Sequence, residues 1–227
     1  MPRRSFLIRH VRAHAPDERE LEKYLLQWRT ADLYARPEAF PRLAAEGMFG
    51  RPGLLSVEIG CSTGEYICSL AVEHPERLFV GIDINLKSLM VATGQAAAQS
   101  LENVRFIKAP MQWLYPLMLP DSLEAVYVHF PDPGLRPKYR KRQLLNEAFM
   151  DNVHRALVPG GMLSLVTDNA ELFEGLLTLV EADRRFEKTH SERYLIGFEP
   201  GVKSRYQLYW EQHGIPTKRV ELRKRVS

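Results

Sequence analysis

A short apolar run that ends in a glycine-rich turn is the feature that most constrains the fold of this chain. Residues 54–59 form a nearly continuous apolar run with one acid, Glu58, and lead into Gly60-Cys61-Ser62-Thr63-Gly64. Apolar residues at helical spacing follow over 64–73. Because such a run bounded by glycines is typical of a buried strand, we expect a strand, a turn and a helix in succession. In this arrangement a ligand can approach the turn backbone and meet the N-terminus of the helix.

The same alternation of apolar runs and helical patterns continues along the chain. Further strands are predicted at 78–84, 103–108, 123–130 and 162–167, and further helices at 87–100, 143–157 and 169–183. We expect the aromatic segments around Tyr194 and from Tyr206 to Trp210 to form the closing antiparallel strands. The pattern indicates a Rossmann-like α/β fold, with a mostly parallel sheet of seven strands and helices on both faces.

The length of 227 residues suits one domain with appendages better than two full domains. We expect residues 1–50 to be a basic, helical N-terminal extension, with a short amphipathic helix over 17–26, and residues 51–227 to be the α/β domain. No apolar run approaches the roughly 18 to 20 residues of a membrane span, and the N-terminus lacks the pattern of a secretory signal. Cys61 and Cys68 belong to one predicted turn and helix, so we expect no structural disulfide and a cytoplasmic protein.

Basic residues are clustered, although the formal net charge is only +3. The clusters are Arg3, Arg4, Arg9 and Arg12; Arg136, Lys138, Arg140, Lys141 and Arg142; and Lys218, Arg219, Arg223, Lys224 and Arg225. Each cluster alone could be a solvated face or tail. Three of them together favour a polyanionic partner, because clustered cations bind phosphates and release condensed counterions.

The turn and a second acid suggest which cofactor is bound. Asp83 ends the second predicted strand, where an acid can bind ribose hydroxyls. Dinucleotide sites use the pattern G-x-G-x-x-G, but here Ser62 stands at the middle position between Gly60 and Gly64. Glu58 would repel a pyrophosphate, whereas it suits the cationic aminoacyl end of S-adenosyl-L-methionine; alternatively it pairs with a nearby Arg or Lys. These features favour a methyltransferase over a dehydrogenase.

Two further acids follow neighbouring strands. Asp132 lies in Phe130-Pro131-Asp132-Pro133 after the fourth predicted strand, and Asp168 follows Thr167 at the end of the fifth. Ligands of open parallel sheets bind outside the carboxyl ends of the strands, so both acids are expected close to the cofactor. Asp168 could instead cap the next helix. We predict an active site at these acids, with Asp132 as the catalytic residue.

The motifs together resemble the bacterial tRNA (guanine-N7)-methyltransferases, which are class I methyltransferases. The resemblance covers about residues 54–214 and rests on the segments 57–65, Phe79-Val80-Gly81-Ile82-Asp83, Phe130-Pro131-Asp132-Pro133, Lys138-Tyr139-Arg140-Lys141-Arg142, Leu157-Val158-Pro159-Gly160-Gly161 and Thr167-Asp168. The Phe-Pro-Asp-Pro segment with its trailing basic run is the most specific of these.

The resemblance implies methyl transfer from S-adenosyl-L-methionine to N7 of a guanosine in the variable loop of tRNA. Guanine N7 has a lone pair and no proton to lose, so no general base is needed at the nucleophile. Asp132 and Asp168 are expected to stabilise the cationic purine and accept hydrogen bonds from the base. Alignment of the methyl group with N7 would supply most of the barrier reduction. The remaining expected substrate-binding residues contact the phosphate backbone of the tRNA; they are Lys138, Arg140, Lys141 and Arg142.

The chain departs from the family pattern at three places. Gly134 replaces a Trp, Ala109 replaces an acid expected beside the adenine, and Ser204-Arg205-Tyr206-Gln207 aligns with a Thr-x-Phe/Tyr-Glu element. Ser204 and Gln207 are therefore expected substrate-binding residues, with one carboxylate fewer than in the family. Alternatives are a methyltransferase that acts on another RNA or a small molecule, and a non-catalytic RNA-binding paralogue. We expect a monomer or homodimer with no metal and no membrane partner.

Overall fold

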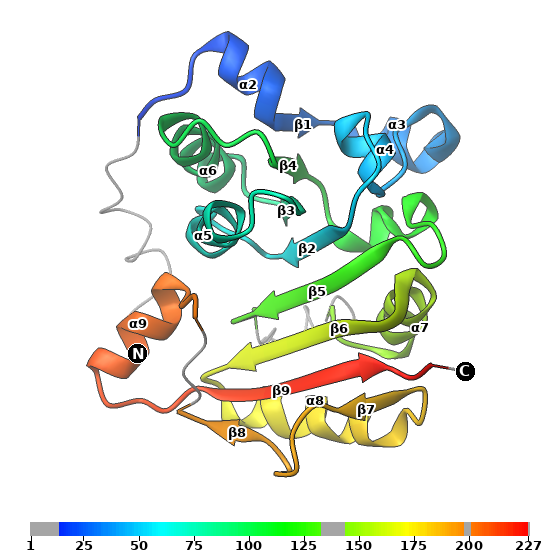
Figure 1. The fold of residues 1–227 in the computed structure, drawn as a ribbon, viewed down its shortest axis with the longest axis vertical. Coiled ribbons are helices and arrows are strands. Elements are labelled where there is room, and N and C mark those ends of the chain that lie inside the picture. The colour runs from blue at the N-terminus through cyan, green and yellow to red at the C-terminus, as the bar shows by residue number, and fades with distance from the viewer. Residues whose placement is uncertain (1–13, 133–143, 198–200, 227) are drawn as a thin grey trace.

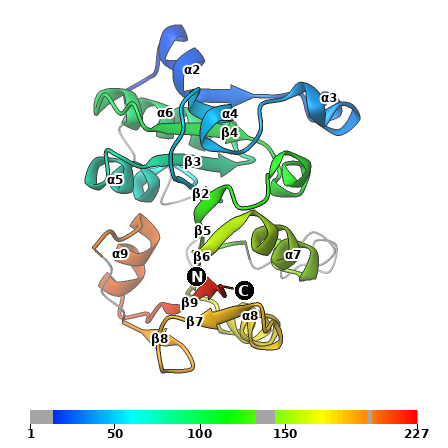
Figure 2. The same ribbon diagram turned by 45° about the vertical axis from the view of Figure 1, so that its right-hand side comes forward.

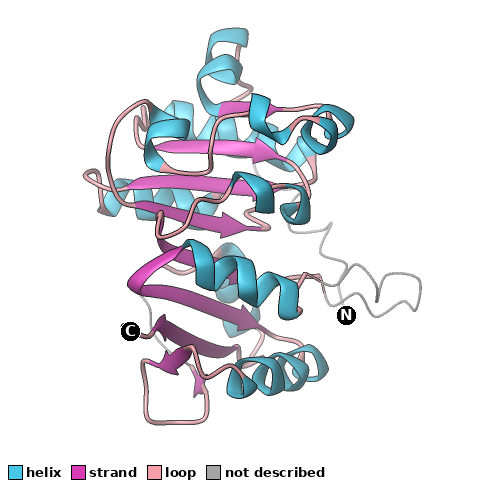
Figure 3. Ribbon diagram, turned by 90° about the vertical axis from the view of Figure 1, so that its right-hand side faces the viewer, coloured by secondary structure: helices cyan, strands magenta, loops and turns pink. Residues whose placement is uncertain are grey.

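A single sheet runs through the part of the chain that the computed structural model describes, which is residues 14–132, 144–197 and 201–226 (Figure 1). Within these residues the sheet has nine strands in the order β1-β4-β3-β2-β5-β6-β9-β7, and β8 pairs with β9. The strands are β1 Leu25–Gln27, β2 Leu55–Ile59, β3 Leu78–Asp83, β4 Val104–Lys108, β5 Leu123–His129, β6 Leu157–Thr167, β7 Phe186–Lys188, β8 Leu195–Ile196 and β9 Lys218–Lys224. The strands twist relative to one another along the sheet, as is usual (Figure 3).

Helices connect these strands. They are α2 Glu18–Tyr24, α3 Thr30–Ala35, α4 Ala45–Phe49, α5 Glu65–Glu73, α6 Leu86–Ala98, α7 Glu147–Ala156, α8 Ala170–Ala182 and α9 Arg205–Gln212, with the 3₁₀ helices η1 Pro37–Ala39, η2 Met111–Trp113 and η3 Tyr115–Leu117. None of the helices in the described ranges is long and apolar enough to cross a bilayer.

Strand direction locates the switch point of the sheet. From β1 to β6 the neighbouring strands are parallel, whereas β9 is antiparallel to β6, β7 and β8. The chain moves from β2 outward to β3 and β4, and then returns to place β5 on the other side of β2. In open α/β sheets, ligands bind at the carboxyl ends of the strands beside such a reversal. The ends of β2 and β5 are therefore the place to look for a site.

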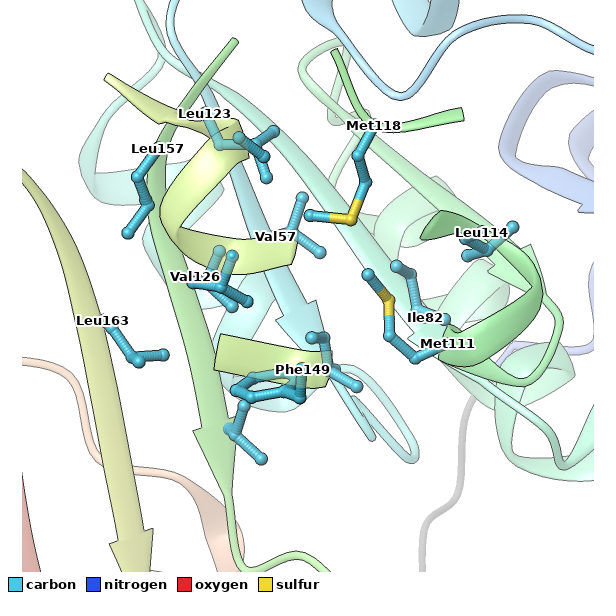
Figure 4. Packing of buried hydrophobic residues seen from close by; sticks show 14 of the residues in the cluster. Val57, Ile82, Met111, Leu114, Met118, Leu123, Val126, Phe149, Leu157 and Leu163 are labelled. Carbon is cyan, nitrogen blue, oxygen red and sulfur yellow. The ribbon is translucent and has the colours of Figure 1, made fainter. Parts of the chain in front are cut away.

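The helices cover the sheet in two layers (Figure 2). Figure 2 shows α5, α6 and α9 on one side of the sheet and α7 and α8 on the other. The larger core lies on the α7 side, where Val57, Val126 and Leu163 from neighbouring strands form one layer with Phe149 of α7 (Figure 4). These strands read as near-continuous apolar runs because both of their faces are covered.

The N-terminal segment contributes a helix and an edge strand to the sheet. The expected amphipathic helix is present as α2, and Asp17 and Glu20 form a capping box at its start. β1 then pairs with β4 in parallel, and Tyr24 and Leu25 are buried. A three-residue strand produces too little alternation to be recognised in a sequence, so β1 was not predicted.

The predicted Rossmann-like α/β class is confirmed, but two details were wrong. The described sheet has nine strands and not seven, because β1 adds an edge and β8 pairs beside β9. The segment from Tyr206 to Trp210 lies in helix α9 and not in a strand. Tyr206 and Trp210, two of its three aromatic residues, are four apart and share one helix face, and the Ser204 side chain caps the helix by accepting from the Gln207 amide. Cap and spacing outweigh the β-propensity of the aromatic residues.

Candidate functional site

The turn after β2 has a backbone built for close approach. Gly60, Ser62 and Gly64 all have positive φ, at 79°, 51° and 80°. A Cβ on Gly64 would lie 2.7 Å from the Cβ of Ala92, so glycine is needed for the turn to contact α6. A Cβ on Gly60 would meet nothing within 4 Å. The turn is therefore closed towards α6 and open on the Gly60 side, where a ligand has access to the backbone.

Asp83 at the end of β3 holds this turn in place. Its Oδ2 accepts a hydrogen bond from the Ser62 amide at 2.9 Å, and its Oδ1 accepts from the Asn85 amide at 2.7 Å. Burial raises the pKa of Asp83, and the hydrogen bonds from the backbone oppose this shift. The acid predicted to bind ribose thus lies beside the turn and orients it.

Glu58 is the next-to-last residue of β2, and only 4% of its surface is exposed. Its Oε2 is buried and has no hydrogen-bond partner in the described parts of the chain, where it also forms no ion pair with an Arg or Lys. Burial, and then the charges of Glu65 and Asp83, raise the pKa of Glu58 to about 8. The alternative that Glu58 merely pairs with a nearby cation is wrong. A buried acid of this kind is suited to receiving a cationic ligand group.

A cavity of about 20 Å³ lies at the switch point, between the ends of β2 and β5. Glu58, Gly60 and Ser62 line it on the β2 side, and His129 and Phe130 line it on the β5 side. Other lining residues come from the turn and the start of α5, and from the start of α9; they are Cys61, Glu65, Tyr66, Ser204, Arg205 and Tyr206. The volume is enough for about one water molecule, so α9 lies close over the turn.

α9 packs on the ends of β5 and β6, at the end of the sheet where their arrows finish (Figure 1). Phe130, Val166 and Trp210 form a small cluster there, and the ring of Tyr206 stacks on Phe130 at 5.8 Å between centroids. Phe130 has a φ of 52°, a left-handed conformation that is uncommon for a bulky side chain. Such strain often occurs at functional sites, and here it turns the chain out of β5 towards Asp132, which is exposed.

Asp168 follows β6 and is left available for a ligand. The cap of α8 is Asn169, whose Oδ1 accepts a hydrogen bond from the Leu172 amide at 2.8 Å. The alternative that Asp168 caps this helix is therefore wrong. Asp168 Oδ1 is shielded from solvent and has no hydrogen-bond partner among the described residues. An unpaired carboxylate oxygen is costly to bury, which marks this position as a candidate for substrate binding.

Of the other predicted site residues, some are buried or cap a helix, and the basic ones are not described by the structure. Ala109 is buried in the core beside Asp83, and its amide already donates to the Asp83 carbonyl at 3.2 Å. Ser204 caps α9, and Gln207 is buried and donates to Glu211 Oε1 at 2.9 Å. The basic residues Lys138, Arg140, Lys141 and Arg142, together with Gly134, lie outside the described residues.

Sequence reasoning missed a buried polar group next to the cavity. The His129 Nε2 lies 3.2 Å from Ser164 Oγ, and its ring packs at 4.5 Å from that of Tyr66. Burial and the nearby charge of Arg219 hold the pKa of His129 well below its ordinary value, so the imidazole is neutral. The available signal was a histidine inside a predicted buried strand, immediately before Phe130.

Comparisons with known proteins agree with this geometry. A family described as "Putative methyltransferase" matches residues 53–215. A tRNA (guanine-N(7)-)-methyltransferase of Rubrobacter xylanophilus is 47% identical, over 93% of this chain and 95% of the relative. The chain belongs to the tRNA (guanine-N(7)-)-methyltransferase family. A second member of this family, from Chloroherpeton thalassium, is 36% identical over 90% of both chains.

Solved structures show that this family member has a methyltransferase fold. The antibiotic-resistance methyltransferase Kmr superposes with a TM-score of 0.54 at 16% identity, covering 89% of this chain and 95% of Kmr. At this identity the likeness concerns the fold alone. The family assignment rests on the relatives in sequence, and it identifies this protein as a methyltransferase.

Proposed function

We propose that this protein transfers the methyl group of S-adenosyl-L-methionine to N7 of a guanosine in the variable loop of tRNA. The observation that supports the proposal is that Asp132 and Asp168 follow the adjacent strands β5 and β6, and that β5 pairs with β2, which leads into the glycine turn. Relatives named tRNA (guanine-N(7)-)-methyltransferase align with 90% or more of the chain.

The residues around the turn fit the cofactor. S-adenosyl-L-methionine carries an ammonium group, and Glu58 offers a buried Oε2 that lacks a hydrogen-bond partner among the described residues. Gly60 leaves open space on the ligand side of the turn, and Asp83 lies at the strand end suited to ribose hydroxyls. Glu58, Gly60, Gly64 and Asp83 would thus hold a cofactor whose sulfonium supplies an electrophilic methyl group. Ala109 would contribute a small apolar surface at the end of β4, and not its amide.

The acids at the strand ends suit the methylated base. N7 attacks through a lone pair and the purine becomes cationic, so the protein's task is electrostatic. Asp132 and Asp168 can accept hydrogen bonds from the guanine N–H groups and stabilise the developing charge. Gln207 is buried and bonded to Glu211, so we infer that it acts through the structure of α9, which Ser204 caps. Lys138, Arg140, Lys141 and Arg142 would contact phosphates of the tRNA.

The test is a methylation assay with the purified protein, S-adenosyl-L-methionine and unmodified tRNA, analysed by mass spectrometry of the digested nucleosides. We expect 7-methylguanosine to accumulate, and sequencing of the product should place it in the variable loop. Methylation of another atom would contradict the proposed reaction. Cofactor binding without methylation of any tRNA would favour a non-catalytic paralogue.

A further inference from the structure

Arg205, the first residue of α9, ties this helix to the turn that follows β2. Its Nε lies 3.2 Å from Glu65 Oε1, and Glu65 is the first residue of α5. The other carboxylate oxygen of Glu65 accepts a hydrogen bond from Thr63 Oγ1 at 2.6 Å. The pair therefore bridges two elements that are far apart in the sequence and that meet at the wall of the cavity.

The cavity is lined by an acid from the strand side and by a cation from the α9 side. Glu58 forms part of the strand side, with an oxygen that has no hydrogen-bond partner among the described residues, and Arg205 forms part of the α9 side. The amino-acid end of the proposed cofactor is a zwitterion, which needs an acid for its ammonium group and a cation for its carboxylate. Arg205 is the one cationic side chain among the described residues that line this cavity.

We propose that Arg205 binds the carboxylate of the cofactor's amino-acid end, and that it releases Glu65 to do so. This inference rests on the proposed function, and it concerns the cofactor and not the RNA. Arg205 can leave Glu65 because its own side chain is 36% exposed, so solvent is available to it during the exchange. The present pair is weak because Glu65 Oε1 accepts no hydrogen bond within the described chain, whereas a ligand carboxylate can accept two parallel hydrogen bonds from the guanidinium group.

The exchange would couple the cofactor to the substrate side of the site. Tyr206 follows Arg205 and stacks on Phe130, which lies two residues before Asp132. A cofactor held by Arg205 therefore stabilises the position of α9 over the ends of β5 and β6. We expect the amide hydrogens of α9 to exchange more slowly when the cofactor product is bound.

The experiment compares two ligands by titration calorimetry. S-adenosylhomocysteine has the amino-acid end, whereas 5′-methylthioadenosine lacks it. In Arg205→Gln the affinity for S-adenosylhomocysteine should fall by about 10- to 100-fold, which is the loss of a hydrogen bond to a charged group. The affinity for 5′-methylthioadenosine should stay within about threefold, and Arg205→Lys should recover part of the loss. Arg193→Gln, which breaks a surface pair with Glu181, is the matched control and should change neither affinity.

A second variant distinguishes ligand binding from a structural role. Glu65→Gln weakens one competitor for Arg205 and removes a charge that repels the ligand carboxylate, so it should raise the affinity for S-adenosylhomocysteine by about two- to fivefold. If the Arg205–Glu65 pair only holds α9 in position, both variants should weaken the binding of both ligands equally, and the proposal would be wrong. An unchanged ratio of the two affinities in Arg205→Gln would overturn it as well.

The titrations and the methylation assay together separate this inference from the proposed function. A wild-type protein that binds S-adenosylhomocysteine but does not methylate tRNA would refute the proposed reaction, and the affinity ratio would still decide the role of Arg205. A wild-type protein that binds neither ligand would refute both.

Discussion

Glu58 is an acid inside a buried strand, and no Arg or Lys in the described ranges pairs with it. Its pKa of about 8 lies far above the ordinary value of 4.5. Between these two values the folded protein keeps a proton that the unfolded chain releases. The stability of the ligand-free protein should therefore fall as the pH rises from about 4.5 to about 8. An acid that destabilises the free protein is consistent with a role in binding a cation.

Glu58→Gln should remove this pH dependence. At pH 7 the variant should be more stable than the wild type by on the order of 3 kcal/mol, because pH 7 lies about 2.5 pH units above the ordinary pKa of 4.5 and each unit corresponds to about 1.36 kcal/mol. Near pH 4.5 the two proteins should be about equally stable. Urea unfolding across this pH range measures the difference. Glu187→Gln, on an exposed strand with a surface partner in Arg225, is the control and should follow the wild type. A difference that does not vary with pH would show that Glu58 titrates normally.

Asp132 is the residue on which the chemistry is expected to depend most. Asp132→Asn should lower kcat/KM for tRNA by about 100-fold or more, because a charge that stabilises the cationic base is lost. Its affinity for S-adenosylhomocysteine should stay within about threefold of the wild type. The control is Asp121→Asn, which breaks an exposed pair with Lys224 before β5 and should leave the rate unchanged. Equal losses in rate and cofactor affinity would mean that Asp132 supports the cofactor instead.

At the level of elements, α6 is an anchor for the chain before α2. Gly94 lies in α6, and a Cβ there would come within 1.9 Å of the carbonyl oxygen of His14. α2 also packs on α6, and it leads directly into β1. The docking of the N-terminal segment therefore depends on one glycine in a helix interior, a position where glycine is otherwise unfavourable.

Gly94→Ala should destabilise the protein by about 1 to 3 kcal/mol, because the chain at His14 must move away. Gly175→Ala in α8 is the matched variant, since a Cβ there meets nothing within 4 Å, and it should stabilise the protein by about 0.5 to 1 kcal/mol. Urea unfolding of both variants tests the pair. A stabilising effect of Gly94→Ala would show that the contact with His14 is not needed.

At the scale of the whole molecule, the segment before residue 51 shares the core of the α/β domain. Tyr24, Leu33 and Leu43 each have at most 2% of their surface exposed, and β1 continues the sheet beyond β4. The boundary at residue 50 stays a prediction from the sequence. From this burial we infer that the two parts unfold as one cooperative unit.

A protein truncated to begin at residue 51 should be less stable, because it lacks the N-terminal part of this cooperative unit. We expect its Tm to fall by more than about 10 °C, because each kcal/mol corresponds to about 2 to 4 °C in a protein of this size and several large buried side chains are removed. A chain that begins at His14 keeps the described contacts and serves as the control. Calorimetry measures both. An unchanged Tm for the shorter chain would establish residue 50 as a true domain boundary.

The α/β class, the glycine turn and the acids of the candidate site were predictable from the sequence. Periodicity, turn glycines and the ends of apolar runs are local signals, and parallel strands bring their carboxyl ends to one edge in any such fold. Glu58, Asp83, Asp132 and Asp168 could therefore be placed without coordinates. The order of the strands and the roles of Ser204 and Gln207 could not be placed in this way.

Only the tertiary structure decided what lies across the cavity from Glu58. The helix α9 is held by packing on Phe130 and Val166, and its Arg205 meets Glu65 about 140 residues earlier in the chain. His129 is neutral because it is buried beside Arg219 from the antiparallel strand β9. Such contacts depend on which distant elements share a face. No local pattern of residues determines this, because the free energy that fixes it comes from packing between the elements.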